Sequence, residues 1–181
     1  FFGQLGIGTY GPYNLRSTLT AMIDDFGDPI SGCTAIAAGL DYSLVLKEDG
    51  SVWATGYNAV GQLGIATSGE GDFRSTLTAM IGEGTSGCTA ISAGENHSLV
   101  LKEDGSVWAI GYNAVGQLGI ATSGEGNFRS TLTAMIGEGT SGCTAIAAGV
   151  NHSLVLKNTG AVYATGDNTS GQLGIGSDLQ G

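Results

Sequence analysis

Residues Ser86–Leu118 have the sequence SGCTAISAGENHSLVLKEDGSVWAIGYNAVGQL, and close copies of it occur at Ser31–Leu63 and Ser141–Leu173. The cysteines of these copies, Cys33, Cys88 and Cys143, are equally spaced, since 88 − 33 equals 143 − 88. Self-similarity at a fixed period of this length is the sequence signature of a repeat architecture. The chain is therefore a tandem array, with repeats predicted at approximately 1–55, 56–110 and 111–165 and the start of the next repeat at 166–181.

The pattern inside each copy predicts short β-strands. CTAIAAG, HSLVLK and SVWATG are each too short for a helix and carry β-branched or aromatic residues. Leu99–Leu101 is a continuous apolar run, which favours a strand that is covered on both faces. The KEDG segments Lys47–Gly50 and Lys102–Gly105 predict hairpins with type I′ turns, because Asp-Gly supplies the positive φ values that such turns need.

A further strand is predicted from the octapeptide RSTLTAMI, which occurs at Arg16–Ile23, Arg74–Ile81 and Arg129–Ile136. Thr, Leu and Ile alternate in it with Ser and Ala, as expected of a half-exposed outer strand. Each copy is expected to complete the sheet that the preceding three strands begin. The unit is therefore a four-stranded antiparallel meander, and the chain is predicted to be all-β.

Four-stranded units at a period of about 50 residues are typical of a β-propeller. The pattern AAGxxxSLVLKxDGxVWATGxNxxGQLG also resembles the regulator of chromosome condensation repeat over the whole chain. Members of that family form seven-bladed propellers. The resemblance therefore implies that residues 1–181 form part of a single propeller domain of that type. About three blades are expected. Phe1–Thr9 begins inside a repeat and without Met, which favours a fragment of a longer ring over a ring closed by several copies.

Charge restricts the classes of partner. Sixteen acidic residues against six basic ones give a net charge of −10. Nucleic acids and anionic membrane surfaces attract Lys and Arg, so neither is predicted as a partner. No apolar run in the sequence approaches the length of roughly 18 residues that a membrane-spanning helix needs, so membrane insertion is not predicted either. The remaining expectation is a protein partner of unknown identity, further blades of a longer chain, or other copies of the chain.

The three cysteines occupy one equivalent position in each repeat. An odd count cannot pair fully, and equivalent positions in adjacent repeats face the same way, so a disulfide framework is not predicted. They are interpreted as small buried hydrophobes, which favours a reducing intracellular compartment. A three-thiolate metal site is the alternative, but the close C-x₂-C spacing of zinc sites is missing.

No motif predicts catalysis, a cofactor or a metal. His97 and His152 align with Tyr42, and a catalytic or metal-binding role would not readily survive a change to Tyr. The family resemblance implies that this His is a structural, hydrogen-bonded core residue. Gly82–Gly87 matches G-x-G-x-x-G, but a predicted strand rather than a helix follows, which favours a turn over a dinucleotide site. Ser68–Asp72 presents oxygen ligands that suit Ca²⁺, but without the spacing of an EF-hand, so a solvated loop is favoured. The chain is therefore predicted not to be an enzyme.

Sequence variation concentrates in the connections between predicted strands. The second and third repeats differ mostly at turns and strand ends, and the first repeat carries an insertion within Asp24–Ile30. Loops of a rigid scaffold commonly carry recognition, although neutral drift produces the same pattern. The candidate protein-binding residues of these rim loops are Asp24, Asp25, Phe26, Asp28, Glu70, Asp72, Glu95, Glu125 and Asn127.

The leading hypothesis is a non-enzymatic β-propeller whose rim loops bind another protein, as a scaffold or as a structural subunit of a larger assembly. The alternative is regulation of an enzyme. Some members of the family that this chain resembles catalyse nucleotide exchange on a small GTPase, and a secreted bacterial member inhibits β-lactamases. Exchange activity would need a projecting loop, for which Asp24–Ile30 is the best candidate.

Overall fold

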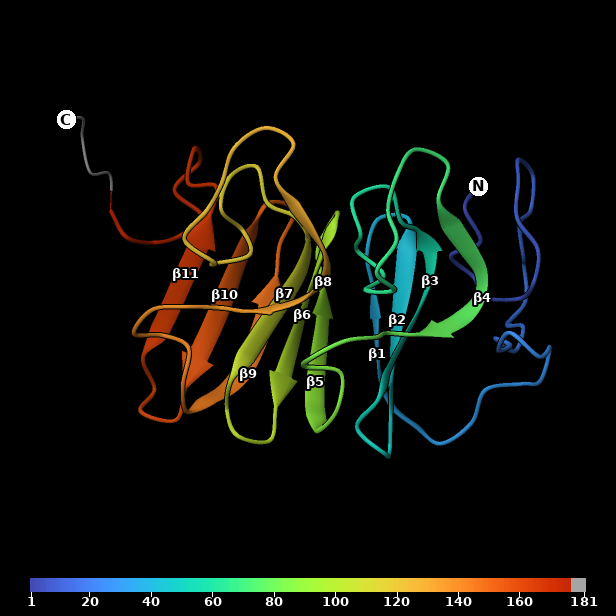
Figure 1. Ribbon diagram of the computed structural model, residues 1–181, viewed down its shortest axis with the longest axis horizontal. Helices are drawn as coiled ribbons and strands as arrows, with labels where there is room; N and C mark the ends of the chain where they lie inside the picture. The colour runs from blue at the N-terminus through green and yellow to red at the C-terminus, as the bar shows by residue number, and fades with distance from the viewer. Residues whose placement is uncertain (177–181) are drawn as a thin grey trace.

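The computed structural model describes residues 1–176, which form three antiparallel sheets in succession (Figure 1). The first has the order β1-β2-β3-β4, the second β5-β6-β7-β8, and the third contains β9, β10 and β11. We call each sheet a blade. The strands are β1 (Cys33–Ala38), β2 (Tyr42–Lys47), β3 (Val52–Tyr57), β4 (Phe73–Ala79), β5 (Cys88–Ala93), β6 (His97–Lys102), β7 (Val107–Tyr112), β8 (Phe128–Ala134), β9 (Cys143–Ala148), β10 (His152–Lys157) and β11 (Val162–Gly166).

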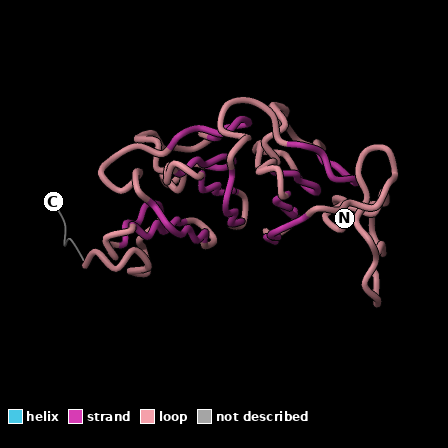
Figure 2. Tube along the Cα trace, turned by 90° about the horizontal axis from the view of Figure 1, so that it is seen from below, coloured by secondary structure: helices cyan, strands magenta, loops and turns pink. Residues whose placement is uncertain are grey.

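The blades fan out along an arc, with the N-terminus near one end of it and the third blade at the other (Figures 1 and 2). The inner strands meet one another, since β1 lies against β5 and β5 against β9. Their alanine-rich sequences allow this close approach. The outermost strands β4 and β8 pair with β3 and β7, so the octapeptide completes the blade begun by the preceding three strands, as predicted.

Two apolar clusters fill the spaces between neighbouring blades. The cluster between the first and second blades contains Leu63, Met80, Val100, Ile110 and Leu132, and the other contains Leu99 and Leu101. Successive residues of β6 thus point to opposite faces of the sheet, into different clusters. This confirms that the apolar run of that strand is covered on both sides.

The first copy of the octapeptide does not form the predicted strand. Residues 16–22 lie outside any strand, and Ile23 and Asp24 make isolated bridges to Pro29 and Leu77. The sequence is strand-competent, as β4 and β8 show, but the described residues contain no preceding three-stranded unit with which it could pair. The strand prediction for Arg16–Ile23 was therefore wrong, because a strand needs a neighbour as well as a propensity.

The hairpin turns also differ from the prediction. Gly50 has a φ of +75° and its N–H donates to the carbonyl of Lys47 at 3.0 Å, but Asp49 does not have a positive φ. A type I′ turn needs positive φ at both central residues. The geometry is instead that of a turn followed by a left-handed glycine. Gly105 repeats it, with a φ of +75°.

The cysteines are all free, but only two of the three are buried. Cys88 and Cys143 lie in the clusters between blades, as predicted, whereas Cys33 is exposed on β1. Cys88 packs toward the preceding blade, and the described residues contain no such blade to cover Cys33. The described residues include no helix long and apolar enough to cross a membrane. The last five positions of the predicted fourth repeat, 177–181, lie outside the described residues.

Candidate functional site

The polar side chains shared by the repeats bond one blade to the next. The hydroxyl of Ser98 lies 3.0 Å from both the Gln62 carbonyl and the Tyr42 hydroxyl, which are in the preceding blade. The Tyr42 hydroxyl itself donates to the carbonyl of His97. All these side chains are buried. A catalytic group must reach a substrate, so these residues serve the fold rather than chemistry.

His97 occupies the same kind of position between the second and third blades. Ser153 Oγ has a single proton, which it donates to the Gln117 carbonyl at 2.7 Å. Its oxygen must therefore accept the proton of His97 Nε2, which lies 3.0 Å away. His97 is therefore the neutral tautomer that carries its proton on Nε2, and its buried Nδ1 has no hydrogen-bond partner among the described residues. Burial, and then the nearby His152, lower the pKa of His97 to about 4.

Replacing Ser153 by alanine is expected to lower the free energy of unfolding by about 1–3 kcal/mol, because His97 Nε2–H and the Gln117 carbonyl would both lose a partner in a buried place. Urea unfolding measures the change. Ser43→Ala is the matched control, since Ser43 is only partly buried and donates to the Gln4 carbonyl alone. Equal losses in the two variants would contradict the role assigned to His97.

The candidate rim residues divide between two opposite faces of the protein. Strands β1 and β3 both run antiparallel to β2, so the connections 39–41 and 58–72 leave the blade at the same end. The loop that follows β4 leaves at the other end (Figure 1). By the same topology, Glu70, Asp72, Glu95, Glu125 and Asn127 lie on one face, which we call the β3–β4 face after its long loops. Asp24, Asp25, Phe26 and Asp28 belong to the other face.

In the long loop between β3 and β4, the carboxylate of Asp72 is held by hydrogen bonds, whereas that of Glu70 is exposed to solvent. Asp72 accepts hydrogen bonds from Asn58 Nδ2 at 2.8 Å and Thr67 Oγ1 at 2.7 Å, and forms an ion pair with Arg74 at 2.8 Å. Burial raises the pKa of Asp72, but the bonds from Thr67, Asn58 and Arg74 outweigh it, so the pKa is lowered overall. Asp72 therefore holds the loop in shape and has little capacity left for a metal or a partner.

Asn127 takes the same position in the second blade and binds Asn113 and Arg129. Glu70 and Glu125, two positions before Asp72 and Asn127 in their loops, are exposed to solvent. The two loops thus share a supported base and a free carboxylate near the tip. No cluster of three or more metal-ligating side chains occurs among residues 1–176.

On the other face, the loop containing Asp24–Asp28 lies against the outer edge of the first blade. Asp25 accepts hydrogen bonds from the hydroxyls of Thr76 and Thr78 on β4, and Asp24 caps its own turn through the N–H groups of Phe26 and Asp28. Phe26 projects from this turn with 89% of its surface exposed. The loop is therefore fixed at its base and has an apolar tip.

The inner turns of the three blades form a groove on the β3–β4 face. Ala38-Gly39-Leu40, Ala93-Gly94-Glu95 and Ala148-Gly149-Val150 line it. Leu40 and Val150 are 64% and 59% exposed, and the half-buried Glu95 stands at the equivalent position between them. Sequence comparison of the repeats found Glu95 but missed Leu40 and Val150, although all three occupy the same repeat position. The groove joins a carboxylate to two exposed apolar side chains.

The sequence profile of the regulator of chromosome condensation (RCC1) repeat matches residues 33–62, 88–117 and 143–172. The chain is an RCC1 repeat protein. Its sequence is 35% identical over 175 residues to the regulator of chromosome condensation of Drosophila melanogaster, covering 95% of this chain and 29% of that protein.

RCC1 proteins of known structure have the same fold. Prp20p from Saccharomyces cerevisiae, described by its binding to Gsp1p and histones, superposes with a TM-score of 0.70 at 27% identity, over 81% of this chain and 33% of its own. Yeast RCC1 bound to Kap60 superposes with a TM-score of 0.77 at 22% identity, over 96% of this chain and 40% of its own. The chain thus has the RCC1 propeller fold and spans between 29% and 40% of the length of these relatives.

Proposed function

We propose that this RCC1 repeat protein is a non-enzymatic scaffold that binds a basic protein on its β3–β4 face. The observation that carries the proposal is the groove between the inner turns, in which Leu40, Glu95 and Val150 lie together. The exposed carboxylates of Glu70 and Glu125 stand on the same face. A partner that inserts apolar side chains and surrounds them with Lys or Arg fits this surface.

The net charge of −10 supports a basic partner, and the yeast relative that binds histones supplies a concrete probe. The shared polar residues support the absence of catalysis, because they are buried and used between blades. Asp24, Asp25, Phe26 and Asp28, on the opposite face, are not part of the proposed surface. Their carboxylates provide a control for charge alone.

The test compares two variants with the same change of charge. We expect the triple variant Glu70→Gln, Glu95→Gln, Glu125→Gln to bind core histones about tenfold more weakly than the wild-type chain, because each lost carboxylate removes attraction at the contact. The triple variant Asp24→Asn, Asp25→Asn, Asp28→Asn is expected to bind almost as well as wild type. Titration calorimetry at fixed ionic strength measures both. Equal weakening of the two variants, or no binding by the wild type, would refute the proposal.

Regulation of a small GTPase is the second candidate function, and the yeast relative that binds Gsp1p supports it. The loop Asp24–Ile30 would have to contact the GTPase, and the exposed Phe26 is the side chain best placed to do so. A nucleotide-release assay with Gsp1p tests this. Release that is no faster with the chain than without it removes the candidate.

A further inference from the structure

The connection at residues 9–15 has the backbone of the two long loops of the β3–β4 face but a different tip. It reads TYGPYNL, where the other two read TSGEGDF at 67–73 and TSGEGNF at 122–128. In each loop the sixth residue donates its backbone N–H to the carbonyl three positions earlier. Asn14 Nδ2 also donates to Thr9 Oγ1 at 2.8 Å, and Arg16 donates to Asn14 Oδ1 at 3.0 Å. The loop is therefore held in shape by its own hydrogen bonds.

Tyr13 in this loop has a backbone conformation that normally requires glycine. Its φ is +67°, and the equivalent residues of the other two loops are Gly71 and Gly126, at +83° and +74°. A side chain in this left-handed region costs free energy, and a bulky residue is found there less often than Asn or Asp. Strain of this kind is typical of residues that serve binding rather than folding. The tyrosine is therefore not explained by the stability of its own loop.

The side chain of Tyr13 is not explained by burial either. It is 95% exposed, and Gly71 and Gly126 are exposed as well, so exposure is a property of this position in the loop. Pro12 precedes it where the other loops have glutamate, and the fixed φ of proline restricts the tip. An exposed aromatic side chain on a restricted loop is typical of a residue that anchors a partner.

Tyr10 joins this tip to the neighbouring loop of the β3–β4 face. Its ring is 60% exposed and lies against the ring of Phe73, with the two centroids 4.6 Å apart. Phe73 is the first residue of β4, and the exposed Glu70 lies three positions before it in the long loop. The aromatic surface of Tyr10 and Tyr13 is therefore continuous with the acidic surface of the proposed binding face.

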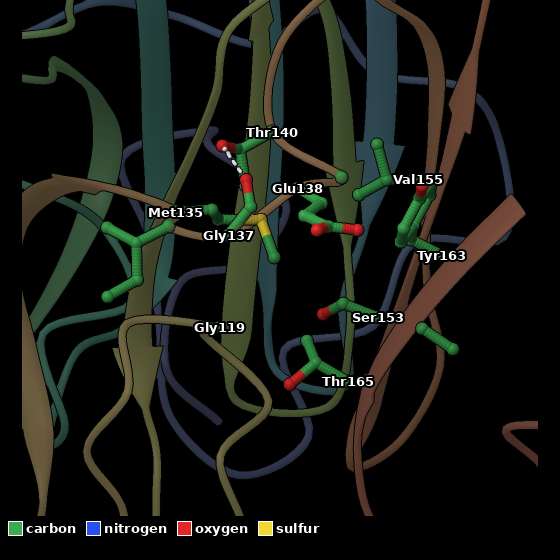
Figure 3. A pocket seen from close by; sticks show the side chains of 12 residues that line it. Gly119, Met135, Gly137, Glu138, Thr140, Ser153, Val155, Tyr163 and Thr165 are labelled. Atoms are coloured by element: carbon green, nitrogen blue, oxygen red, sulfur yellow. Dashed lines mark hydrogen bonds between the residues drawn. The ribbon is translucent and has the colours of Figure 1, made fainter. Parts of the chain in front are cut away.

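The chain's own aromatic side chains show which group such rings bind. A lysine ammonium lies between 5.0 and 5.6 Å from the centroid of three rings, in the pairs Lys47–Trp53, Lys102–Trp108 and Lys157–Tyr163. Figure 3 shows the ring of Tyr163 at the wall of a pocket. Over the ring of Tyr13 no lysine or arginine of residues 1–176 lies in this way, since Arg16 donates instead to Asn14 and Thr9. Its faces are open to a cation from another molecule.

We propose that an arginine of the basic partner stacks on Tyr13, so that this loop selects arginine over lysine. The inference rests on the proposed function and names the side chain by which the face recognises its partner. A guanidinium is planar and weakly hydrated, so it covers an exposed aromatic face better than an ammonium does. The net charge of −10 attracts either cation, and the ring supplies the difference between them.

Oligoarginine and oligolysine peptides of equal length test the proposal by titration calorimetry at fixed ionic strength. We expect the 181-residue chain to bind oligoarginine about three- to tenfold more tightly than oligolysine. Tyr13→Leu is expected to lose most of this preference, because it keeps the charge of the chain and an apolar side chain but removes the ring. Tyr13→Phe keeps the ring and is the matched control, expected to retain the preference. Equal preference in these two variants, or none in the wild type, would overturn the proposal.

Tyr13→Gly tests whether the tyrosine serves binding or folding. We expect this variant to lose the arginine preference and yet to unfold at a urea concentration no lower than that of the wild type, because glycine adopts the φ of +67° without strain. A clearly lower unfolding midpoint would show that Tyr13 serves the fold, which would overturn the proposal.

Core histones distinguish this inference from the proposed function. We expect Tyr13→Leu to bind them several-fold more weakly than the wild type does. If the triple variant Glu70→Gln, Glu95→Gln, Glu125→Gln is weakened but Tyr13→Leu is not, the proposed function stands and the arginine contact of Tyr13 is refuted. A wild-type chain that prefers oligoarginine through Tyr13 but does not bind core histones would support the arginine contact and refute the proposed function.

Discussion

Gly61→Ala is expected to lower the free energy of unfolding by about 3 kcal/mol or more, one of the largest effects that a single methyl can have in this chain. The φ of Gly61 is +78°, which costs an alanine about 1 kcal/mol by itself. The added Cβ would also lie 2.5 Å from Cα of Ser130 and 2.7 Å from the carbonyl oxygen of Arg129. These are backbone atoms of β8, so the second blade would have to move away from the first. Urea unfolding measures the loss.

Gly116→Ala separates the two causes. Gly116 has a φ of +85° and the same place in its repeat, but no backbone of residues 1–176 lies close to its missing Cβ. This variant is expected to lose only the conformational part, about 1 kcal/mol. If both alanine variants unfold at the same urea concentration, the close packing of the GQLG loop on the next blade is not what makes glycine necessary.

A drop in pH from about 6.5 to 4 is expected to destabilise the protein by about 3 kcal/mol through His97 alone. The pKa of His97 is about 4 in the folded chain and near 6.5 when unfolded, so over this interval the unfolded state binds a proton that the folded state does not. Stability is therefore present in full above pH 6.5 and falls as the pH approaches 4. Thermal unfolding as a function of pH measures the slope.

His97→Tyr is the control for this pH dependence, because the first blade already carries Tyr42 at the equivalent position. The Tyr42 hydroxyl lies 3.0 Å from Ser98 Oγ and donates to the His97 carbonyl, so a tyrosine at 97 has the equivalent Ser153 hydroxyl and His152 carbonyl beside it. We expect the variant to fold and to lose most of the slope between pH 6.5 and 4. Carboxylates with lowered pKa values, such as Asp72, would still destabilise it at lower pH. An unchanged slope would show that another group titrates.

Several features of the site could be predicted from the sequence because they are local or periodic. The alignment of Tyr42 with His97 predicted a structural imidazole, and the structure shows it bonded between blades. The insertion at Asp24–Ile30 predicted a surface loop, and Phe26 is exposed there. The alignment could not show that Asp72 is structural and Glu70 is not. Only the folded loop shows that the carboxylate of Asp72 bonds to Asn58, Thr67 and Arg74.

The division of the rim residues between two faces also needed the structure. Asp24, Asp25, Asp28 and Glu70 are all acidic loop positions in the sequence. The direction of the strands sends the loop of Glu70 to one end of the first blade, whereas hydrogen bonds from Thr76 and Thr78 of β4 hold the loop of Asp25 near the other end. The groove between Leu40, Glu95 and Val150 likewise depends on three turns, each a full repeat from the next in sequence, that meet at the inner strands. Contacts between residues so far apart in the sequence depend on how the blades pack, and no local sequence pattern predicts that packing.

The sequence by itself determined the repeat, the all-β architecture and the identity of the strands, because apolar periodicity and glycine positions recur with the period of the repeat. Only the tertiary structure decided which residues at the same repeat position are also equally buried. Arg16–Ile23 and Arg74–Ile81 have the same eight residues, and Cys33 and Cys88 the same place in the repeat, yet one of each pair is exposed and the other packed. The physical reason is that strand pairing and burial are contacts with a neighbour, and the neighbour is supplied by the adjoining blade rather than by the segment itself.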